Sequence, residues 1–245
     1  AGAEGMTGAL QSIVFDFDGV IADSEPLHFR AFQQTLAKEG IALTSAEYYA
    51  RYLGYDDVGL FEALATDRGI PMDASRLSAL LAAKGERLQD MLEHGHVLFP
   101  GAADFVRSAA AEVPIAIASG AMRREIVEIT DAASIGSLFT VIVAAGDTPH
   151  SKPSPAPYLL AFEQLQLHTG RDLDPRRCVA IEDSQWGLDS AREAGLRCVG
   201  VTNSYEANGL QGAELVVSGL DVLTLPTLNQ LCATDPQAAH HTRNA

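Results

Sequence analysis

The chain has 245 residues, of which 47% are hydrophobic, and its 32 acidic and 17 basic residues leave a formal net charge of -15. The apolar fraction is large enough for a sizeable buried core, so we predict a folded globular protein and not a disordered one. The acidic balance argues against nucleic acid and anionic membranes as partners, because both bind basic surfaces.

The chain contains no apolar stretch of transmembrane length. Residues 1–10 lack the basic start and the apolar centre of a signal peptide. We therefore expect no membrane association and a cytoplasmic location.

Short apolar segments rich in Val, Ile and Ala recur along the chain, which is typical of parallel strands buried on both faces. The predicted strands are 12–16, 114–119, 141–145, 178–182, 198–201 and 214–217. Amphipathic segments that predict helices lie between them, at 103–111, 123–132, 155–166 and 185–194. This alternation predicts an α/β fold with a doubly wound parallel sheet, formed by residues 12–23 and 99–228.

Residues 24–98 interrupt the alternation, because they contain no convincing strand. Their apolar periodicity predicts four helices, at 27–39, 45–52, 57–68 and 74–93. We interpret this segment as a helical domain inserted after the first strand. We expect the termini, residues 1–11 and 229–245, to be flexible, and the protein to be a monomer.

Polar residues gather where the predicted strands end, which is where doubly wound sheets bind ligands. In chain order they are Asp16 and Asp18, Ser119 and Gly120, Lys152, and Glu182 and Asp183. The period of a strand sends Asp16 and Asp18 the same way and Phe17 into the core. Two such close carboxylates are tolerable if a cation lies between them or if one holds a proton. We therefore predict a site for a divalent metal and a phosphate group at this edge of the sheet.

Four segments resemble, in order and spacing, the signature motifs of the haloacid dehalogenase-like superfamily. They are Asp16-Phe17-Asp18-Gly19-Val20, Ser119-Gly120, Lys152-Pro153 and Glu182-Asp183-Ser184. The inserted helical segment is similar to the small cap of the beta-phosphoglucomutase-like subgroup. The resemblance extends from Ser12 to about Leu225.

The resemblance implies a reaction in which Asp16 attacks phosphorus and forms an aspartyl phosphate. Asp18 would act as general acid and then as general base. Repulsion between a carboxylate and a phosphate calls for a metal, and oxygen ligands favour Mg²⁺. Its expected ligands are Asp16, the Asp18 carbonyl group and Asp183, with Glu182 holding a metal-bound water.

Two residues have an alternative role beside the expected one. Lys152, considered in its Pro-rich loop alone, is an ordinary exposed cation, but the acids on neighbouring strands favour a role in neutralising Asp16 and the phosphoryl group. Ser119 is either a helix N-cap or a phosphate ligand, together with the backbone amides of Gly120 and Ala121.

The inserted segment offers three candidates for substrate binding: Arg51, Gly54 and His28. Gly54 fits the glycine-centred loop of the resembling mutase, but the lysine of that loop is missing. Arg51 is either a phosphate ligand or a solvated helix residue, and His28 either couples the cap to Asp18 or packs on the linker. Acidic residues beside this loop would repel a second phosphate, which favours a hydrolase of monophosphates.

We therefore predict a magnesium-dependent phosphomonoester hydrolase that acts on a small phosphorylated metabolite, a sugar or polyol phosphate. The alternative is a phosphohexomutase similar to beta-phosphoglucomutase. A phosphonate hydrolase would need a lysine in the cap for a Schiff base. The candidates are Lys38 and Lys84, which we expect on exposed helix faces. A catalytically idle phosphate sensor is disfavoured by the complete set of acids and lysine.

Overall fold

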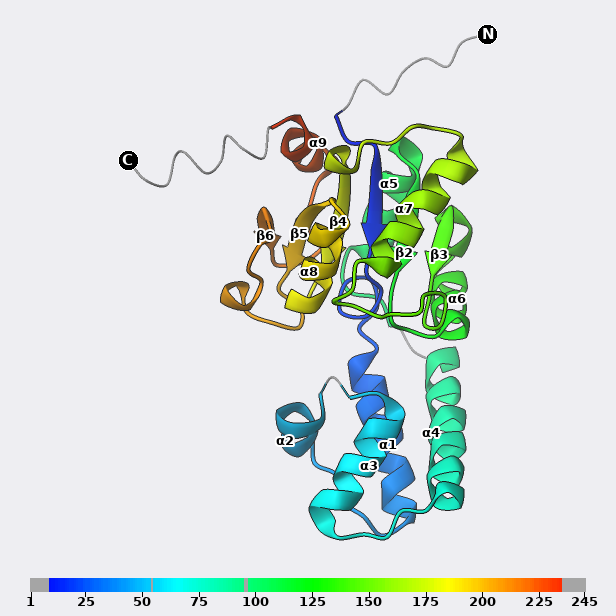
Figure 1. Cartoon of the computed structure of the whole chain (residues 1–245). Coiled ribbons are helices and arrows are strands. Elements are labelled where there is room, and N and C mark those ends of the chain that lie inside the picture. Colours follow the sequence, from blue (N-terminus) through cyan, green and yellow to red (C-terminus); the bar gives the residue numbers. More distant parts are fainter. Residues whose placement is uncertain (1–8, 54, 95–96, 235–245) are drawn as a thin grey trace. The chain divides into compact units, whose positions relative to one another are not determined.

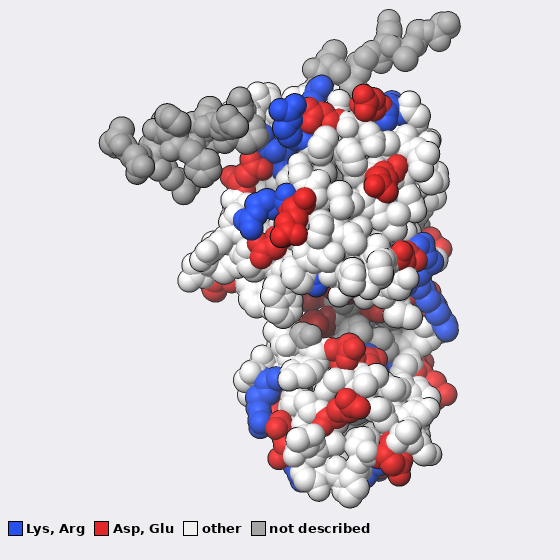
Figure 2. Space-filling view, in the orientation of Figure 1, with Lys and Arg blue, Asp and Glu red and all other residues white. Residues whose placement is uncertain are grey.

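The computed structural model describes residues 9–53, 55–94 and 97–234 (Figure 1). The chain divides into two compact units, which we call the core unit (residues 1–23 and 97–245) and the helical unit (Ser24–His96). No helix within the described ranges is both long and apolar enough to cross a membrane. On the face shown in Figure 2, Lys and Arg lie in small separate groups, most of them beside Asp or Glu.

The described part of the core unit contains one parallel sheet, with strand order β3-β2-β1-β4-β5-β6. The strands are β1 Ser12–Phe15, β2 Ile115–Ala118, β3 Val141–Val143, β4 Cys178–Glu182, β5 Arg197–Val201 and β6 Leu215–Val217. The chain returns from β3 at one edge to β4 in the middle, so the strand order reverses between β1 and β4. This is the predicted doubly wound α/β fold, which the structure confirms, and the reversal marks the place where such sheets bind ligands.

Helices cover both faces of this sheet (Figure 1). Those of the core unit are α5 Ala102–Glu112, α6 Arg123–Ala132, α7 Ala156–Thr169, α8 Gln185–Glu193 and α9 Leu225–Ala233, with short 3-10 turns at Gly136–Leu138, Pro175–Arg177 and Ala207–Gly209. Tyr158 of α7 and Leu188 of α8 pack with Val14 in one apolar cluster. Phe15, which points to the opposite face, makes edge-on contacts with Phe105 and Phe139. Burial on both faces explains why the central strands are apolar at most positions.

The end of the core unit differs from the sequence-based prediction. We placed residues 229–245 in a flexible terminus, but helix α9 continues to Ala233, with Leu228 and Cys232 buried. Arg197 of β5 donates to the carbonyl oxygens of Leu231 (2.8 Å) and Thr234 (2.9 Å). At the other end Leu10, also expected to be flexible, is buried. These residues gain their order from contacts with distant parts of the chain, which local periodicity does not contain.

The two connections to the helical unit run antiparallel within the core unit. Asp23 donates its backbone N–H to Val97 (2.6 Å), and Phe99 donates to Ile21 (3.0 Å). The insertion therefore leaves the sheet and returns to it at one place. The division falls after residue 96, where the sequence suggested residue 98.

The helical unit consists of α1 Glu25–Lys38, α2 Ser45–Glu47, a π-helical turn Tyr48–Tyr52, α3 Asp57–Arg68 and α4 Ala74–His94. The predicted helix 45–52 is thus two short pieces. Tyr48 donates to Glu25, and the Tyr52 hydroxyl donates to Asp67 (2.8 Å). The Asp56 side chain caps α3 by accepting from the Gly59 N–H (2.7 Å).

The prediction for Lys84 was also wrong. We expected this residue on an exposed helix face, but its side chain is 1% exposed. Its Nζ lies 2.8 Å from both carboxylate oxygens of Asp57 and 2.9 Å from Nδ1 of His28. It also lies 4.7 Å from the centre of the Phe32 ring. A buried lysine needs such a counter-charge, so Lys84 joins α4 to the first turn of α3.

Candidate active site

The turn after β1 places the first acid of the site. The Asp16 N–H donates to the carbonyl of Ile181 on β4 (2.9 Å), which extends the sheet by one residue. Asp16 Oδ1 accepts from the Phe17 N–H (2.7 Å), and Phe17 is fully buried. The turn needs glycine next, because Gly19 has a φ of +79° and a Cβ there would lie 1.9 Å from Oδ2 of Asp183. The first motif and the Glu182-Asp183 motif therefore touch.

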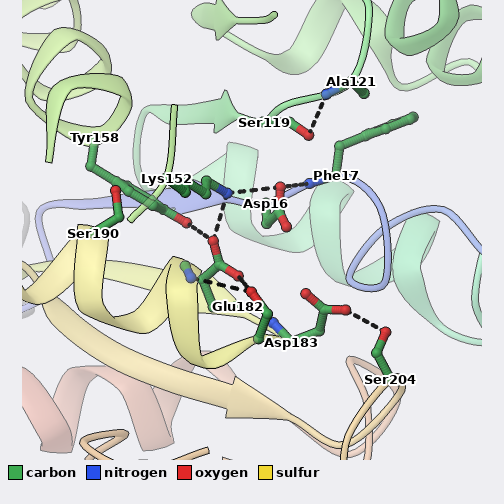
Figure 3. Close-up of polar contacts among 12 residues, drawn as sticks. Asp16, Phe17, Ser119, Ala121, Lys152, Tyr158, Glu182, Asp183, Ser190 and Ser204 are labelled. Atoms are coloured by element: carbon green, nitrogen blue, oxygen red, sulfur yellow. Dashed lines mark hydrogen bonds and ion pairs between the residues drawn. The ribbon is translucent and has the colours of Figure 1, made fainter. Parts of the chain in front are cut away.

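Lys152 joins two acids from neighbouring strands (Figure 3). Its Nζ lies 2.9 Å from Asp16 Oδ1 and 2.6 Å from Glu182 Oε1, and its side chain is 14% exposed. The Tyr158 hydroxyl donates to the same Glu182 oxygen (2.7 Å). Burial alone would lower the pKa of Lys152, but the two carboxylates raise it above its ordinary value. Lys152 is therefore a fixed positive charge beside Asp16.

Glu182, Asp183 and Asp16 form a buried group in which one carboxylate oxygen of each residue lies within 4.8 Å of one oxygen of each of the others. Ser204, in the loop after β5, donates to Asp183 Oδ2. Burial, followed by the carboxylates of Asp16 and Glu182, raises the pKa of Asp183 to about 8. Burial and Asp16 also raise the pKa of Glu182. Three carboxylates thus share a single lysine in a poorly solvated place, which is costly without a further cation.

The residues present fit a hard divalent cation. All three acids offer oxygen, the ligand type that Mg²⁺ prefers. Both Glu182 oxygens already accept from other residues, Oε1 from Lys152 and Tyr158 and Oε2 from the backbone of Asp183 and the hydroxyl of Ser184. Within the described ranges, Oδ2 of Asp16 and Oδ1 of Asp183 have no such donor. These two oxygens are the ones most available to a metal.

Ser119 follows β2 at the same edge and is buried, with its N–H donating to Val143 (3.0 Å). Its Oγ accepts from the Ala121 N–H (3.2 Å), while Gly120 is exposed. The N-cap of α6 is Met122, not Ser119, and it makes no side-chain cap. The alternative of a helix N-cap is therefore wrong for Ser119.

The remaining predicted residues are not brought into this cluster. Asp18 is half-buried in the turn, and its carboxylate is outside the group of three. Arg51 and His28 belong to the helical unit, where Arg51 pairs with Asp67 (2.8 Å) and His28 contacts Lys84. Gly54 lies outside the described residues.

Two residues that hold the site together, Tyr158 and Ser204, were not predicted from the sequence. In the sequence Tyr158 has the position of a core residue in an amphipathic helix. No residue near it in the chain indicates that its hydroxyl donates to Glu182. Ser204 could have been found, because it follows the fifth strand and the same rule of strand ends applies there. The Asn203 side chain beside it donates to the Gly19 carbonyl (2.8 Å) and so supports the turn after β1.

Comparison with known proteins shows the family of this chain. The family model described as haloacid dehalogenase-like hydrolase matches residues 13–201. The chain is 34% identical over 206 residues to Protein CbbY of Rhodobacter capsulatus, covering 80% of this chain and 87% of that protein. The chain therefore belongs to the haloacid dehalogenase-like hydrolases.

Two further relatives have a name or a bound ligand that indicates their chemistry. A protein of Thermotoga maritima named phosphorylated carbohydrates phosphatase is 28% identical, over 89% of this chain and 95% of that one. A CbbY variant from Rhodobacter sphaeroides, solved in complex with xylulose-(1,5)bisphosphate, superposes with a TM-score of 0.76 at 28% identity, covering 89% of this chain and 99% of that structure.

Proposed function

We propose that the protein is a magnesium-dependent phosphatase that hydrolyses phosphate monoesters through an aspartyl phosphate on Asp16. The observation that carries the proposal is the buried cluster of Asp16, Lys152, Glu182 and Asp183 where the strand order reverses. Membership of a hydrolase family and the phosphatase name of one relative support it.

In the first step an oxygen of the Asp16 carboxylate attacks phosphorus, and the bond from phosphorus to the ester oxygen breaks. Asp18 donates a proton to the departing oxygen, which leaves as an alcohol. Lys152 lies 2.9 Å from Asp16 and reduces the repulsion between that carboxylate and the anionic phosphoryl group. The hydroxyl of Ser119 and the backbone N–H of Gly120 hold the phosphoryl oxygens, and the Ala121 N–H, which donates to Ser119 Oγ, orients that hydroxyl.

In the second step water attacks the phosphorus of the aspartyl phosphate. Asp18, now ionised, accepts a proton from this water, and the bond between phosphorus and Asp16 breaks. The products are inorganic phosphate and the regenerated Asp16 carboxylate. Asp18 is again protonated at the end of the cycle.

We assign Mg²⁺ to Asp16, Asp183 and the Asp18 carbonyl group. When bound it neutralises charge on the phosphoryl group. Glu182 has the different main task of positioning Lys152, because both of its oxygens already accept hydrogen bonds. Gly187 permits this placement, since a Cβ there would lie 1.9 Å from the Glu182 carboxyl carbon.

The substrate class that we propose is a small phosphorylated metabolite, a sugar or polyol phosphate. The carbohydrate phosphatase name of one relative and the sugar bisphosphate bound to another support this class. We propose no mutase activity, because Arg51, the candidate for a second phosphate, is paired with Asp67.

The test is release of inorganic phosphate from a panel of sugar, polyol and short-chain monophosphates, with Mg²⁺ and with a chelator. We expect release that depends on the metal. A panel without any phosphate release, or release that a chelator leaves unchanged, would contradict the proposal.

The raised pKa of Asp183 predicts how Mg²⁺ affinity changes with pH. In the metal-free protein this carboxyl keeps its proton up to about pH 8, whereas in the unfolded chain the carboxyl loses its proton near pH 3.8, the ordinary pKa of an aspartate. The metal must displace that proton, so affinity should rise roughly tenfold to a hundredfold between pH 6 and pH 8. Titration calorimetry measures it.

The same shift has a consequence for stability. The folded metal-free protein binds a proton that the unfolded chain has lost, so its stability should decrease as pH rises from about 4 to 8. Added Mg²⁺ should therefore raise Tm more at pH 8 than at pH 5. Asp183→Asn should remove both the pH dependence and the Mg²⁺ response, and an equal Mg²⁺ response at the two pH values would contradict this assignment.

A further inference from the structure

Large apolar side chains are exposed next to the site residues of the core unit. Seven are exposed in the described part of that unit: Met122, Val127, Leu159, Leu167, Trp186, Tyr205 and Val222. Three of them directly adjoin the candidate site, since Met122 follows Ala121, Trp186 lies three residues after Asp183 and Tyr205 follows Ser204. Single exposed apolar residues are common, so exposure alone does not indicate a function. The position of these three next to site residues does suggest one.

Of the three we consider Trp186, because the contacts of its helix define the flank on which it lies. It lies in the first turn of α8, whose N-cap Ser184 accepts from the Gly187 N–H (3.2 Å). Gly187 and Leu188 are buried and form the inner face of the helix. Trp186 lies on the flank four residues before Ser190, and Ser190 Oγ donates to the Ser154 carbonyl (2.6 Å). Residues four apart share a helix face, so Trp186 lies on the flank that faces the Lys152 loop.

Helix geometry also directs the Trp186 Cα–Cβ bond toward the start of α8. The Cα–Cβ bonds of a helix tilt toward its N-terminus, and the N-terminus of α8 adjoins the end of β4 that carries Glu182 and Asp183. The indole is 64% exposed, although α8 buries its other large apolar residue, Leu188. An exposed indole thus lies in the first turn of the helix that directly follows Glu182 and Asp183.

We propose that Trp186 is a specificity-determining residue that contacts a ring in the alcohol part of the substrate. The inference rests on the proposed phosphatase function and concerns the alcohol part of its substrate. The preferred esters carry a ring face, as in a cyclic sugar or a heterocycle, because such faces stack on indole. Short open-chain phosphates offer no such face and gain nothing from Trp186.

The first test uses fluorescence, because Trp186 is the single tryptophan among the 245 residues. The Asp16→Asn protein, loaded with Mg²⁺, is titrated with a cyclic hexose phosphate, a nucleoside monophosphate, glycerol phosphate and inorganic phosphate. We expect a saturable change in emission with one or both ring esters and a much smaller change with the other two. The two ring esters distinguish a sugar from a heterocycle. Equal responses to all four ligands, or none, would overturn the proposal.

The second test is the kinetics of Trp186→Ala and Trp186→Phe. For the ring ester that responds, we expect Ala to raise KM about five- to twentyfold with kcat changed less than twofold, and Phe to restore most of the affinity. KM for glycerol phosphate should stay unchanged. Leu167→Ala, at another exposed apolar residue, is the matched control and should change neither constant. An equal loss on all esters would mean a structural role and would overturn the proposal.

These outcomes separate the inference from the function on which it rests. If the phosphatase proposal fails, the unaltered protein releases phosphate from no ester. If only the role of Trp186 fails, the unaltered protein and Trp186→Ala hydrolyse ring and open-chain esters in the same ratio.

Discussion

Asp16→Asn is expected to abolish phosphate release while leaving the protein folded. The amide is a poor nucleophile and has no negative charge with which to attack phosphorus, so kcat should fall at least about a thousandfold. The side chain keeps its size, and its remaining oxygen can still accept from the Phe17 N–H, a bond of 2.7 Å in the parent protein. The measurements are phosphate release under saturating substrate and Mg²⁺, and thermal unfolding.

A matched control is Asp104→Asn in α5, where the side chain is 89% exposed and pairs with Arg107 at 3.1 Å. This variant should keep full activity. If Asp16→Asn retained more than a tenth of the parent turnover, with Asp104→Asn unchanged, Asp16 would not be the nucleophile.

Lys152→Met should reduce activity and stability together. Removing the ammonium group leaves Asp16 and Glu182, which it contacts at 2.9 and 2.6 Å, as close carboxylates without their counter-charge. Loss of one partner of a buried ion pair costs about 3–5 kcal/mol. Loss of a charge that stabilises the transferring phosphoryl group costs roughly a hundredfold to a thousandfold in kcat. Urea unfolding in chelator and steady-state kinetics measure the two effects.

The control is Lys38→Met, since Lys38 is exposed at the end of α1. It should change neither quantity. Added Mg²⁺ should recover part of the stability of Lys152→Met, because a cation partly replaces the lost charge, and should leave kcat low. Normal kcat in a stable Lys152→Met protein would show that the lysine is neither a charge partner nor part of the reaction.

Much of the core unit could be predicted because its signals are local. Each strand is short, apolar at successive positions and followed by a polar turn, so the parallel sheet follows from the pattern of residues. Asp16, Lys152 and Asp183 were recognised as strand-end residues because parallel strands bring their carboxyl ends to one edge. The gathering of the acids at the reversal between β1 and β4 agrees with that reasoning.

Other features depend on contacts between residues far apart in the chain. Lys84 looked exposed because α4 has many polar residues, and only the approach of Asp57 and His28 makes its burial possible. Helix α9 has a short and weakly patterned sequence, and its order comes from hydrogen bonds with Arg197. Tyr158 could not be predicted as a partner of Glu182, because α7 and β4 meet only in the folded sheet.

The sequence by itself determined the chemical groups of this protein: acids, a hydroxyl and a lysine at the ends of apolar strands. Residue type and spacing carry that information because strand period and helix period set directions within a segment. Only the tertiary structure decided which groups share their charges, with Glu182 tied to Lys152 and Tyr158, and Asp183 to Ser204. The pKa shifts of the site follow from these distances and from burial, and both exist only once separate strands have packed together.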